Sequence, residues 1–500
     1  MNTSFSKKFA IFWFVLAGAC FISVQGQTEA ERFAGLRKQI EANLEKNKIP
    51  GMSIGVAEKG KIIWETGIGW ADREKRRRAT AQTIYSIGST SKPITATAIM
   101  MLVEDGKLDL DRPANDYLGE ERITSPFGDG GSISLRRLLN HTSGLSRHSQ
   151  MLIGSELNNR VSMAETIQRY GVTVRPSGEA FEYSNLGYGI LSRIVKRTSE
   201  VDFETFLKQR IFVPLGMRNS SYGAPVGRNA GLSAAYGPDQ KAIPSILADT
   251  PGAADVYSSV HDLLLFGMFH LDESEQNQKQ ILSKASRDLM KTDSVTRDLS
   301  KYGLGFESLL VGKYRIVFHH GSNGYGASVF LLVPEKRICI SVLANITTAE
   351  AQTVADEILK VLLPDYEENL AAFRRVPRPE VSQRYQPSGD YLGHWTGKIR
   401  TWKEELPVDM WFQPDGDIHI QIKGQYRHLM NGVRVEEGLL RGSFQGGIGT
   451  PDANRHRYNL HLKLKLRSQD RLDGAITSIS YDPSGNVLSS YVSLKKESSQ

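Results

Sequence analysis

The chain has 500 residues, of which 40% are hydrophobic and 23% charged, with a formal net charge of +7. This length is too great for one small core, so we expect at least two folding units of a soluble globular protein. The one dense basic run, over residues 73–78, has no recognition-helix or RNA-binding signature beside it, which argues against a nucleic-acid partner and favours a solvated loop.

The N-terminus has the pattern of a secretory signal peptide. Two lysines precede an apolar run from Phe9 to Val24, and small residues precede a cleavage site after Gly26. We therefore expect residues 1–26 to be removed and the mature protein to be periplasmic or secreted, with no transmembrane span. A lipoprotein anchor at Cys20 is a second option. Once Cys20 is gone, a single cysteine remains, which leaves no intramolecular disulfide.

Residues 27–365 read as one α/β domain of the α+β type. An amphipathic helix is expected over 33–48, followed by a hairpin over 51–72 whose alternating strands meet near residues 58–60. Helical patterns fill the middle, and strands return over 314–345 before a closing helix near 349–363. Strands at both ends with helices between them predict an antiparallel sheet flanked by helices, in which the first and last strands meet, with a helical subdomain.

Two further segments follow this domain. Residues 366–386 are rich in charge and proline and show no sustained period, so we interpret them as a linker. Residues 387–500 alternate between apolar and polar positions, most clearly over 458–468, where leucines alternate with histidine and lysines. This predicts a C-terminal all-β domain, a barrel or a sandwich, with one wet face.

The stretch YSIGSTSKPITATAIMMLVEDG, residues 85–106, predicts a helix that is buried on nearly all sides and ends at Gly106. Ser89 and Lys92 lie one turn apart at its start, so they share a face. Burial and the helix N-terminus both favour a neutral lysine amine, which can accept the serine proton. The pattern S-x-x-K is weak alone and also occurs at Ser4 and Ser493, but only Ser89 begins a buried helix.

Two other short motifs carry suitable chemistry. Tyr183 and Asn185 form the chain's one Tyr-x-Asn, just ahead of a predicted helix, where a phenol can relay protons and an amide can bind a substrate. His319 and Gly321 form the one His-x-Gly, after a strand. A cationic His319 could hold an anionic group, and Gly321 could let a substrate approach. Read alone, the Tyr-x-Asn motif is typical of a helix-capping loop, and the His-x-Gly motif is typical of an exposed strand end.

Together, these motifs resemble the serine β-lactamase and DD-peptidase superfamily, in particular its branch of class C β-lactamases, D-alanyl-D-alanine carboxypeptidases, D-aminopeptidases and esterases. The resemblance covers about residues 49–363. It implies a β-lactamase/transpeptidase-like fold in which Ser89 is the nucleophile and Lys92 and Tyr183 handle its proton. It also implies that Asn185, His319 and Gly321 line the substrate cleft. The next backbone N–H along the strand, that of Ser322, is expected to bind substrate by forming an oxyanion hole with the N–H of Ser89. Some members carry a C-terminal β domain that is lipocalin-like.

The sequence departs from the class C pattern, in which lysine usually stands at position 319 and a hydroxyl at position 320. Both positions are histidine here, which puts carboxylate recognition by this motif and efficient β-lactam turnover in doubt and leaves open which histidine faces the cleft. The implied function is an exported serine hydrolase acting through an acyl-enzyme on amide, ester or lactam bonds of small or cell-wall-derived substrates. No cofactor or metal is expected.

Two alternatives remain. The segment Gly51 to Gly55 matches the nucleophile elbow of α/β-hydrolases, with Ser53 as the nucleophile, although it lies in a predicted hairpin strand rather than between a strand and a helix. The second is a penicillin-recognising sensor or cell-wall binding protein that is acylated but turns over little. Substrate identity, deacylation efficiency, the role of the C-terminal domain and the oligomeric state do not follow from the sequence.

Overall fold

The structure, a computed structural model, describes residues 29–128, 130–224, 231–244, 246–273, 278–376, 382–386, 389–481 and 486–497. The predicted signal peptide over residues 1–26 lies outside them. Within the described residues, no helix combines the length and apolar character that crossing a bilayer requires.

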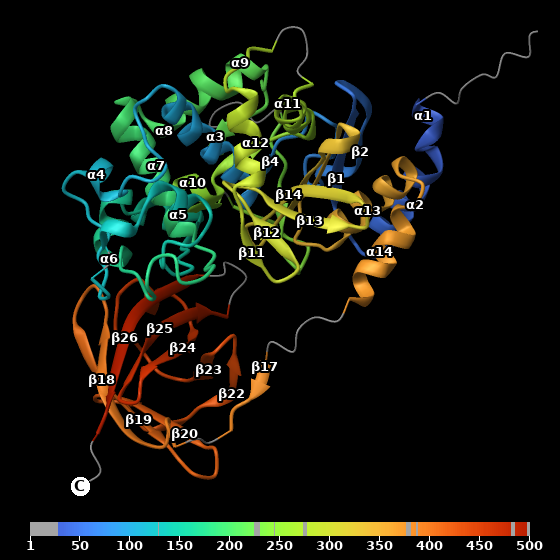
Figure 1. Cartoon of the computed structure of the whole chain (residues 1–500). Coiled ribbons are helices and arrows are strands. Elements are labelled where there is room, and N and C mark those ends of the chain that lie inside the picture. Colours follow the sequence, from blue (N-terminus) through green and yellow to red (C-terminus); the bar gives the residue numbers. More distant parts are fainter. Residues whose placement is uncertain are drawn as a thin grey trace, which may run out of the picture.

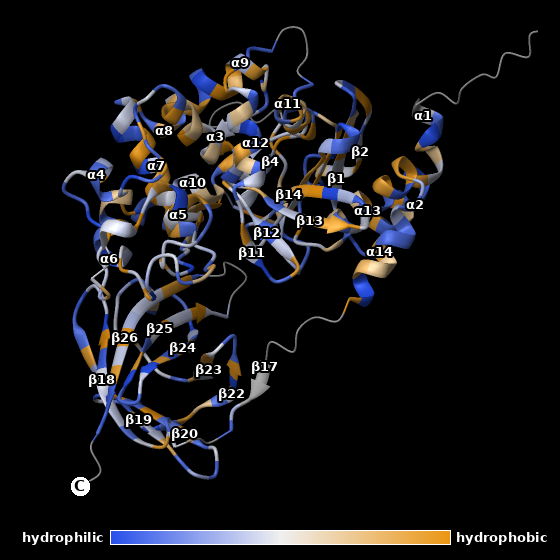
Figure 2. Cartoon of the chain, viewed as in Figure 1, coloured by the Kyte–Doolittle hydropathy of each residue, from blue (hydrophilic) through white to orange (hydrophobic). Residues whose placement is uncertain are grey.

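An antiparallel sheet forms the centre of the first domain (Figure 1). Among the described residues its strand order is β11 (Val295–Arg297), β12 (Ser300–Tyr302), β13 (Glu307–Val311), β14 (Tyr314–Ser322), β15 (Ala327–Val333), β16 (Ile338–Ala344), β1 (Gly51–Glu58), β2 (Lys61–Asp72) and β3 (Arg77–Arg78). Strand β1 pairs with β16, with Ile54 opposite Val342, so the first and last strands of the domain meet as predicted. Figure 2 shows hydrophobic residues along β13 and β14.

The predicted hairpin is confirmed as β1 and β2. Its turn consists of Lys59 and Gly60, which both have positive φ, at 52° and 74°. Two such residues between paired strands are typical of a tight hairpin turn. The predicted opening and closing helices are confirmed as α2 (Ala34–Lys46) and α13 (Glu350–Leu362).

Helices cover both faces of the sheet because the strands alternate in what they bury. In β15, Val329 and Leu331 face a core that includes α2 and α13, whereas Phe330 and Leu332 face the larger core on the other side. That larger core holds α3 (Ser91–Glu104) and α11 (Val260–His270), both buried almost throughout. A helix apolar on every side needs such a position between two layers.

The helical subdomain lies beside α3 and extends the larger core (Figure 1). Its helices are α4 (Asn115–Leu118), α5 (Leu135–Leu139), α6 (Met163–Tyr170), α7 (Asn185–Ser199), α8 (Phe203–Leu207), α9 (Val213–Leu215) and α10 (Pro251–Ala254), while α12 (Lys284–Thr292) packs on α3. Helix α7 contacts both α3 and α10, and these contacts hold the N-terminal end of α3 in place.

The C-terminal domain is an all-β sheet that curls into a nearly closed barrel, as predicted (Figure 1). In the described residues its order is β17 (Ser382–Arg384), β22 (Asn431–Glu436), β23 (Leu439–Phe444), β24 (Tyr458–Ser468), β25 (Arg471–Ser480), β26 (Val487–Lys496), β18 (Gly393–Arg400), β19 (Glu405–Phe412), β20 (Ile418–Ile422) and β21 (His428–Leu429). Leu460, Leu462 and Leu464 are buried inside it, while Lys463 and Lys465 point outward.

The first part of the segment predicted as a linker, residues 366–386, is helical in the structure. Residues Tyr366–Arg375 form helix α14, which packs on β13, and its Tyr366 and Leu370 are buried. Only two apolar positions anchor this helix among many charges, so the sequence shows no clear helical period there. The boundaries predicted for the domains themselves remain predictions.

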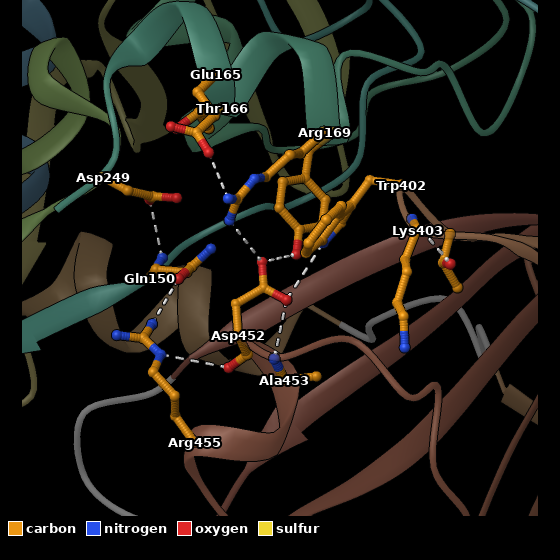
Figure 3. A network of polar contacts seen from close by, with 12 residues as sticks. Gln150, Glu165, Thr166, Arg169, Asp249, Trp402, Lys403, Asp452, Ala453 and Arg455 are labelled. Carbon is orange, nitrogen blue, oxygen red and sulfur yellow. Dashed lines mark hydrogen bonds and ion pairs between the residues drawn. The ribbon is translucent and has the colours of Figure 1, made fainter. Parts of the chain in front are cut away.

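The barrel docks on the helical subdomain through a polar network (Figure 3). Asp452 is its centre: the Tyr170 hydroxyl and the Trp402 indole N–H donate to its carboxylate, and Arg169 lies beside it. Elsewhere Lys465 and Arg467 of β24 pair with Glu179. The outward face of β24, predicted to be wet, therefore faces the first domain.

Candidate active site

Ser89 lies in a 3₁₀ turn, Gly88–Thr90, that leads directly into α3. Gly88 has a φ of 51°, and a Cβ there would lie 2.8 Å from the backbone nitrogen of Ser322. Glycine is therefore required on both counts, backbone conformation and space. The turn is further held by the Ser91 hydroxyl, which donates to the Gly88 carbonyl at 2.6 Å.

Lys92 is completely buried, and its amine contacts Ser89 as the sequence predicts. The Nζ atom lies 3.0 Å from Ser89 Oγ, 2.8 Å from Asn185 Oδ1 and 3.0 Å from the Ala253 carbonyl oxygen. Asn185 and Ala253 offer only acceptors here. A neutral amine that donates its two hydrogens to them directs its lone pair at the Ser89 hydroxyl.

The surroundings of Lys92 favour that neutral form. Burial lowers the pKa of Lys92 well below its ordinary value, and repulsion from Arg147 lowers it further. The amine lies over the rings of Tyr183 and Tyr188, at 4.8 and 5.5 Å from their centroids, and no carboxylate is in contact with it among the described residues. Desolvation without a counter-ion disfavours the ammonium.

Tyr183 and Asn185 reach the site from the loop that begins α7. Ser184, between them, caps the helix by accepting from the Gly187 N–H at 3.1 Å and donates to the Ser146 carbonyl at 2.8 Å. Burial raises the pKa of Tyr183, although its hydrogen bond to Ser89 opposes the rise. The phenol thus stays protonated, so the ionised tyrosine considered from the sequence is disfavoured here.

His141 supports the loop that carries Tyr183 and Asn185. Its Nδ1 accepts from the Ser184 N–H at 3.1 Å, and its ring lies 4.4 Å from that of Tyr183. Burial lowers the pKa of His141 well below its ordinary value, with repulsion from Lys92 as the next cause. The neutral ring positions Tyr183 without adding charge.

His319 does not supply the cation that the sequence suggested. It is 2% exposed, and its Nδ1 donates to the His320 carbonyl at 2.7 Å while its Nε2 accepts from the Tyr302 hydroxyl at 3.0 Å. Burial lowers the pKa of His319 well below its ordinary value, and repulsion from Lys92 adds to this effect. The ring is therefore neutral with both nitrogens occupied, although it lines the cavity at Ser89.

His320 has the opposite orientation. Because successive residues of a strand alternate in direction, its exposed ring turns toward α13, where Nε2 lies 2.5 Å from Oε1 of Gln352. His320 nevertheless borders the cavity at Ser89 as well. His319, on the other face of β14, is the one that packs toward Lys92.

Gly321 and Ser322 bring β14 against the nucleophile turn. A Cβ on Gly321 would lie 2.0 Å from the Ile87 carbonyl oxygen and 3.0 Å from the Ser89 backbone nitrogen. Gly321 thus admits the nucleophile turn itself, rather than the substrate that the sequence suggested. The Ser322 backbone lies against Gly88 in the same way, so the backbone segments that carry the nitrogens of Ser89 and Ser322 lie side by side. An oxyanion hole uses two such neighbouring N–H groups.

A cavity of about 500 Å³ opens at the site, and the residues described above that line it are Ser89, Tyr183, Asn185, His319, His320 and Ser322. Its wall also holds residues that the sequence did not indicate, including Arg147, Asn323, the ion pair of Arg297 with Glu307 at 2.9 Å, and Val487 of the barrel. Val487 enters because its backbone pairs with that of Ser149, with both N–H···O distances at 2.8 Å. No sequence signal links these distant segments.

The competing serines are not placed for catalysis. Ser53 lies inside strand β1, completely buried, and its hydroxyl donates to the Thr80 carbonyl at 2.7 Å. This is no strand-to-helix elbow. Ser493 and Lys496 lie in strand β26, where residues three apart point to opposite faces. Ser4 lies outside the described residues.

Within the part of the chain that the structure describes, no group of three or more His, Cys, Asp or Glu side chains is arranged to hold a metal ion. Cys339, the free cysteine found there, is buried in β16, and burial raises the pKa of its thiol. The site is thus built from a hydroxyl, an amine, a phenol and backbone amides.

A serine hydroxyl within reach of a buried lysine and a tyrosine, between an antiparallel sheet and a helical subdomain, defines the class of serine hydrolases that use S-x-x-K. Residues 36–363 match the family model described as Beta-lactamase, and the chain belongs to the beta-lactamase family. The match spans the sheet and the helical subdomain and ends before α14.

Similar proteins agree with this assignment. The protein named Protein flp from Staphylococcus aureus (strain N315) is 27% identical over 319 residues, which are 62% of this chain and 62% of that protein's own length. The octameric penicillin-binding protein homologue from Pyrococcus abyssi has a TM-score of 0.59 at 23% identity over 92% of this chain and 99% of its own. A class C beta-lactamase has a TM-score of 0.58 at 21% identity, over 66% of this chain and 96% of its own. These two structures support the fold.

Proposed function

We propose that the protein is an exported serine hydrolase that forms an acyl-enzyme at Ser89 and cleaves amide, ester or lactam bonds. The observation that carries the proposal is the hydrogen-bonding geometry of Lys92. Its amine has two fixed acceptors, Asn185 and Ala253, and Ser89 Oγ at 3.0 Å as its third neighbour. The proposal of export rests on the N-terminal sequence alone.

In the acylation step, Ser89 Oγ attacks the substrate carbonyl carbon while its proton passes to the neutral Lys92 amine. The carbonyl oxygen becomes an oxyanion, and the backbone N–H groups of Ser89 and Ser322 stabilise it; losing one such donor typically costs about 3–4 kcal/mol. The proton then passes to the leaving group through the Tyr183 phenol as the bond to the leaving group breaks. Water cleaves the acyl-enzyme by the reverse proton path, with Ser89 recovering its hydrogen.

The proposal favours a peptidase-like or esterase-like activity over efficient β-lactam turnover. At the two positions where class C enzymes usually carry lysine and a hydroxyl, the chain has a neutral, fully bonded His319 and a His320 that turns toward α13. His319 offers no free donor to a substrate carboxylate, neither position offers a hydroxyl, and the Nε2 of His320 is already paired with Gln352. Slow acylation by β-lactams with slower release is therefore expected.

The test is a panel of acyl substrates: a chromogenic cephalosporin, a D-alanyl-D-alanine peptide, a D-amino-acid anilide and a short-chain nitrophenyl ester. Ser89→Ala should abolish turnover of whichever substrate proves best. Ser53→Ala, the matched control in the competing motif, should keep the activity per folded molecule, since that hydroxyl is buried in β1.

Labelling separates the remaining outcomes. Turnover that survives in Ser89→Ala would overturn the assignment of Ser89 as the nucleophile. Loss of turnover in Ser53→Ala but not in Ser89→Ala would identify Ser53 as the nucleophile instead. Stoichiometric labelling of Ser89 by fluorescent penicillin, with no turnover on any member of the panel, would support a sensor instead of a hydrolase.

A further inference from the structure

Arg147 differs in solvent exposure from all its neighbours in the loop between α5 and β5 (Met151–Ile153). Residues 141–150 are all buried except Arg147, which is exposed. It lines the cavity that holds Ser89, and it also lines the adjoining cavity of about 440 Å³ between the first domain and the barrel. A single long cation thus projects from a buried loop at the junction of the two cavities.

The backbone on both sides of Arg147 is fixed. The Ser146 carbonyl accepts from the Ser184 hydroxyl at 2.8 Å, and Ser149 exchanges two backbone hydrogen bonds with Val487 of the barrel. Between them His148 is buried, and its Nε2 lies 2.5 Å from Oδ2 of Asp249. The loop therefore cannot swing Arg147 out of the cavity without breaking these contacts. The backbone that carries Arg147 is thus fixed at the cavity, while its side chain is exposed.

Arg147 also differs from the other cations around these cavities in having no partner. Arg297 pairs with Glu307, Arg175 with Glu182, and Lys465 and Arg467 with Glu179. For Arg147, no hydrogen bond or ion pair is found among the described residues. A guanidinium carries five donors in a planar fork that matches a carboxylate, so its binding capacity is unused.

We propose that Arg147 binds a carboxylate of the substrate and so selects anionic acyl substrates for attack by Ser89. This inference rests on the proposed function, because it names the substrate class of the same site. It assigns to Arg147 the role that the buried, fully hydrogen-bonded His319 cannot perform. The carboxylate replaces water around an exposed guanidinium and meets no competing acid, since the carboxylate of Glu307 is already paired with Arg297.

Arg147 also has an electrostatic effect that a test must separate from binding. It repels the ammonium form of Lys92. Replacing Arg147 would therefore raise the pKa of Lys92 and slow the acylation of Ser89 by every substrate, charged or neutral. The ratio of kcat/KM for an anionic substrate to that for its neutral counterpart cancels this effect, because both values report the same free enzyme.

The experiment uses two substrate pairs and the full chain. The first pair is mono-4-nitrophenyl glutarate and its methyl ester, with the charge on the acyl side. The second is a D-alanyl-D-alanine peptide and its C-terminal amide, with the charge on the leaving-group side. Each pair is measured with the wild type, Arg147→Gln, Arg147→Lys and Arg434→Gln. Arg434 lines the interdomain cavity but not the cavity at Ser89, and it serves as the matched control.

Arg147→Gln should lower the anionic-to-neutral ratio about 10- to 100-fold in at least one pair, as expected for a lost charge-assisted hydrogen bond. The ratio for Arg147→Lys should lie between those of the wild type and Arg147→Gln, because lysine keeps the positive charge but lacks the planar set of donors. Arg434→Gln should leave both ratios within about twofold. An exposed side chain contributes little to folding, so the melting temperatures should stay close to that of the wild type.

Two failures are distinguishable. If the wild type hydrolyses the panel through Ser89 and Arg147→Gln leaves both ratios unchanged, the role of Arg147 is refuted and the proposed function stands. If Ser89→Ala keeps full activity, or the wild type neither turns over nor is acylated by any substrate, the proposed function fails and the inference fails with it.

Discussion

Replacing Gly321 by alanine tests whether β14 holds the nucleophile turn in place. The added Cβ would lie 2.0 Å from the Ile87 carbonyl oxygen, 2.4 Å from Ser328 Oγ and 3.0 Å from the Ser89 nitrogen. The Ser328 hydroxyl can rotate away, but the Ile87 carbonyl is backbone and must retreat by about 1 Å to reach a tolerable contact. That retreat moves the turn carrying Ser89 away from Ser322.

The expected effects follow from that displacement. Overpacking of this kind destabilises by about 1–3 kcal/mol. A misplacement of about 1 Å at a catalytic group costs on the order of 10²-fold in rate. Gly321→Ala should therefore slow acylation of Ser89 far more than it lowers the melting temperature, which should fall by only a few degrees.

The assay is the rate of Ser89 labelling by an acylating probe, with thermal unfolding measured on the same samples. Gly326→Ala is the control, because its Cβ would meet nothing closer than the Ala344 carbonyl oxygen at 3.3 Å. If Gly321→Ala is acylated at the wild-type rate with an unchanged melting temperature, β14 does not hold the nucleophile turn and the argument for a shared oxyanion hole is wrong.

Two other predictions follow from the buried polar groups. Because neutral Lys92 is the active form and its pKa is lowered well below 10.5, kcat/KM should be retained at neutral pH and lost only as the pH falls through the lowered pKa; an acid limb near 10.5 would contradict this. Tyr170→Phe removes a donor to Asp452 and should lower the free energy of unfolding by about 1–3 kcal/mol in guanidinium titrations. Tyr426→Phe, at an 87% exposed position, should have no effect; equal stabilities would mean that the barrel interface does not depend on this bond.

The parts of the fold that sequence predicted are those fixed by local pattern. Helix α3 shows its burial in consecutive apolar residues and its end in Gly106, whose φ is 68°. The spacing of Ser89 and Lys92 needs only the geometry of one helical turn, and the structure places their polar atoms 3.0 Å apart. Local signals of this kind survive because tertiary packing agrees with them.

The parts that sequence could not predict depend on distant contacts. The charge of His319 is decided by its burial and by Tyr302 and Lys92, none of which the His-x-Gly pattern shows. Helix α14 was missed because its charged composition outweighs two buried anchors. The position of Arg147 depends on Val487, which reaches the site only because the barrel docks on the helical subdomain. A desolvated group takes its properties from whatever surrounds it in space.

The charges near Ser89 are arranged so that substrate and base influence one another. Lys92 is kept neutral first by burial and then by repulsion from Arg147. A carboxylate bound at Arg147, as proposed, would offset part of that repulsion, so burial alone must then keep the Lys92 amine neutral while the Ser89 proton moves to it. Burial is the larger of the two causes and does not depend on the charge of the substrate. The two groups thus divide the work: burial sets the state of the base, and Arg147 binds the anion.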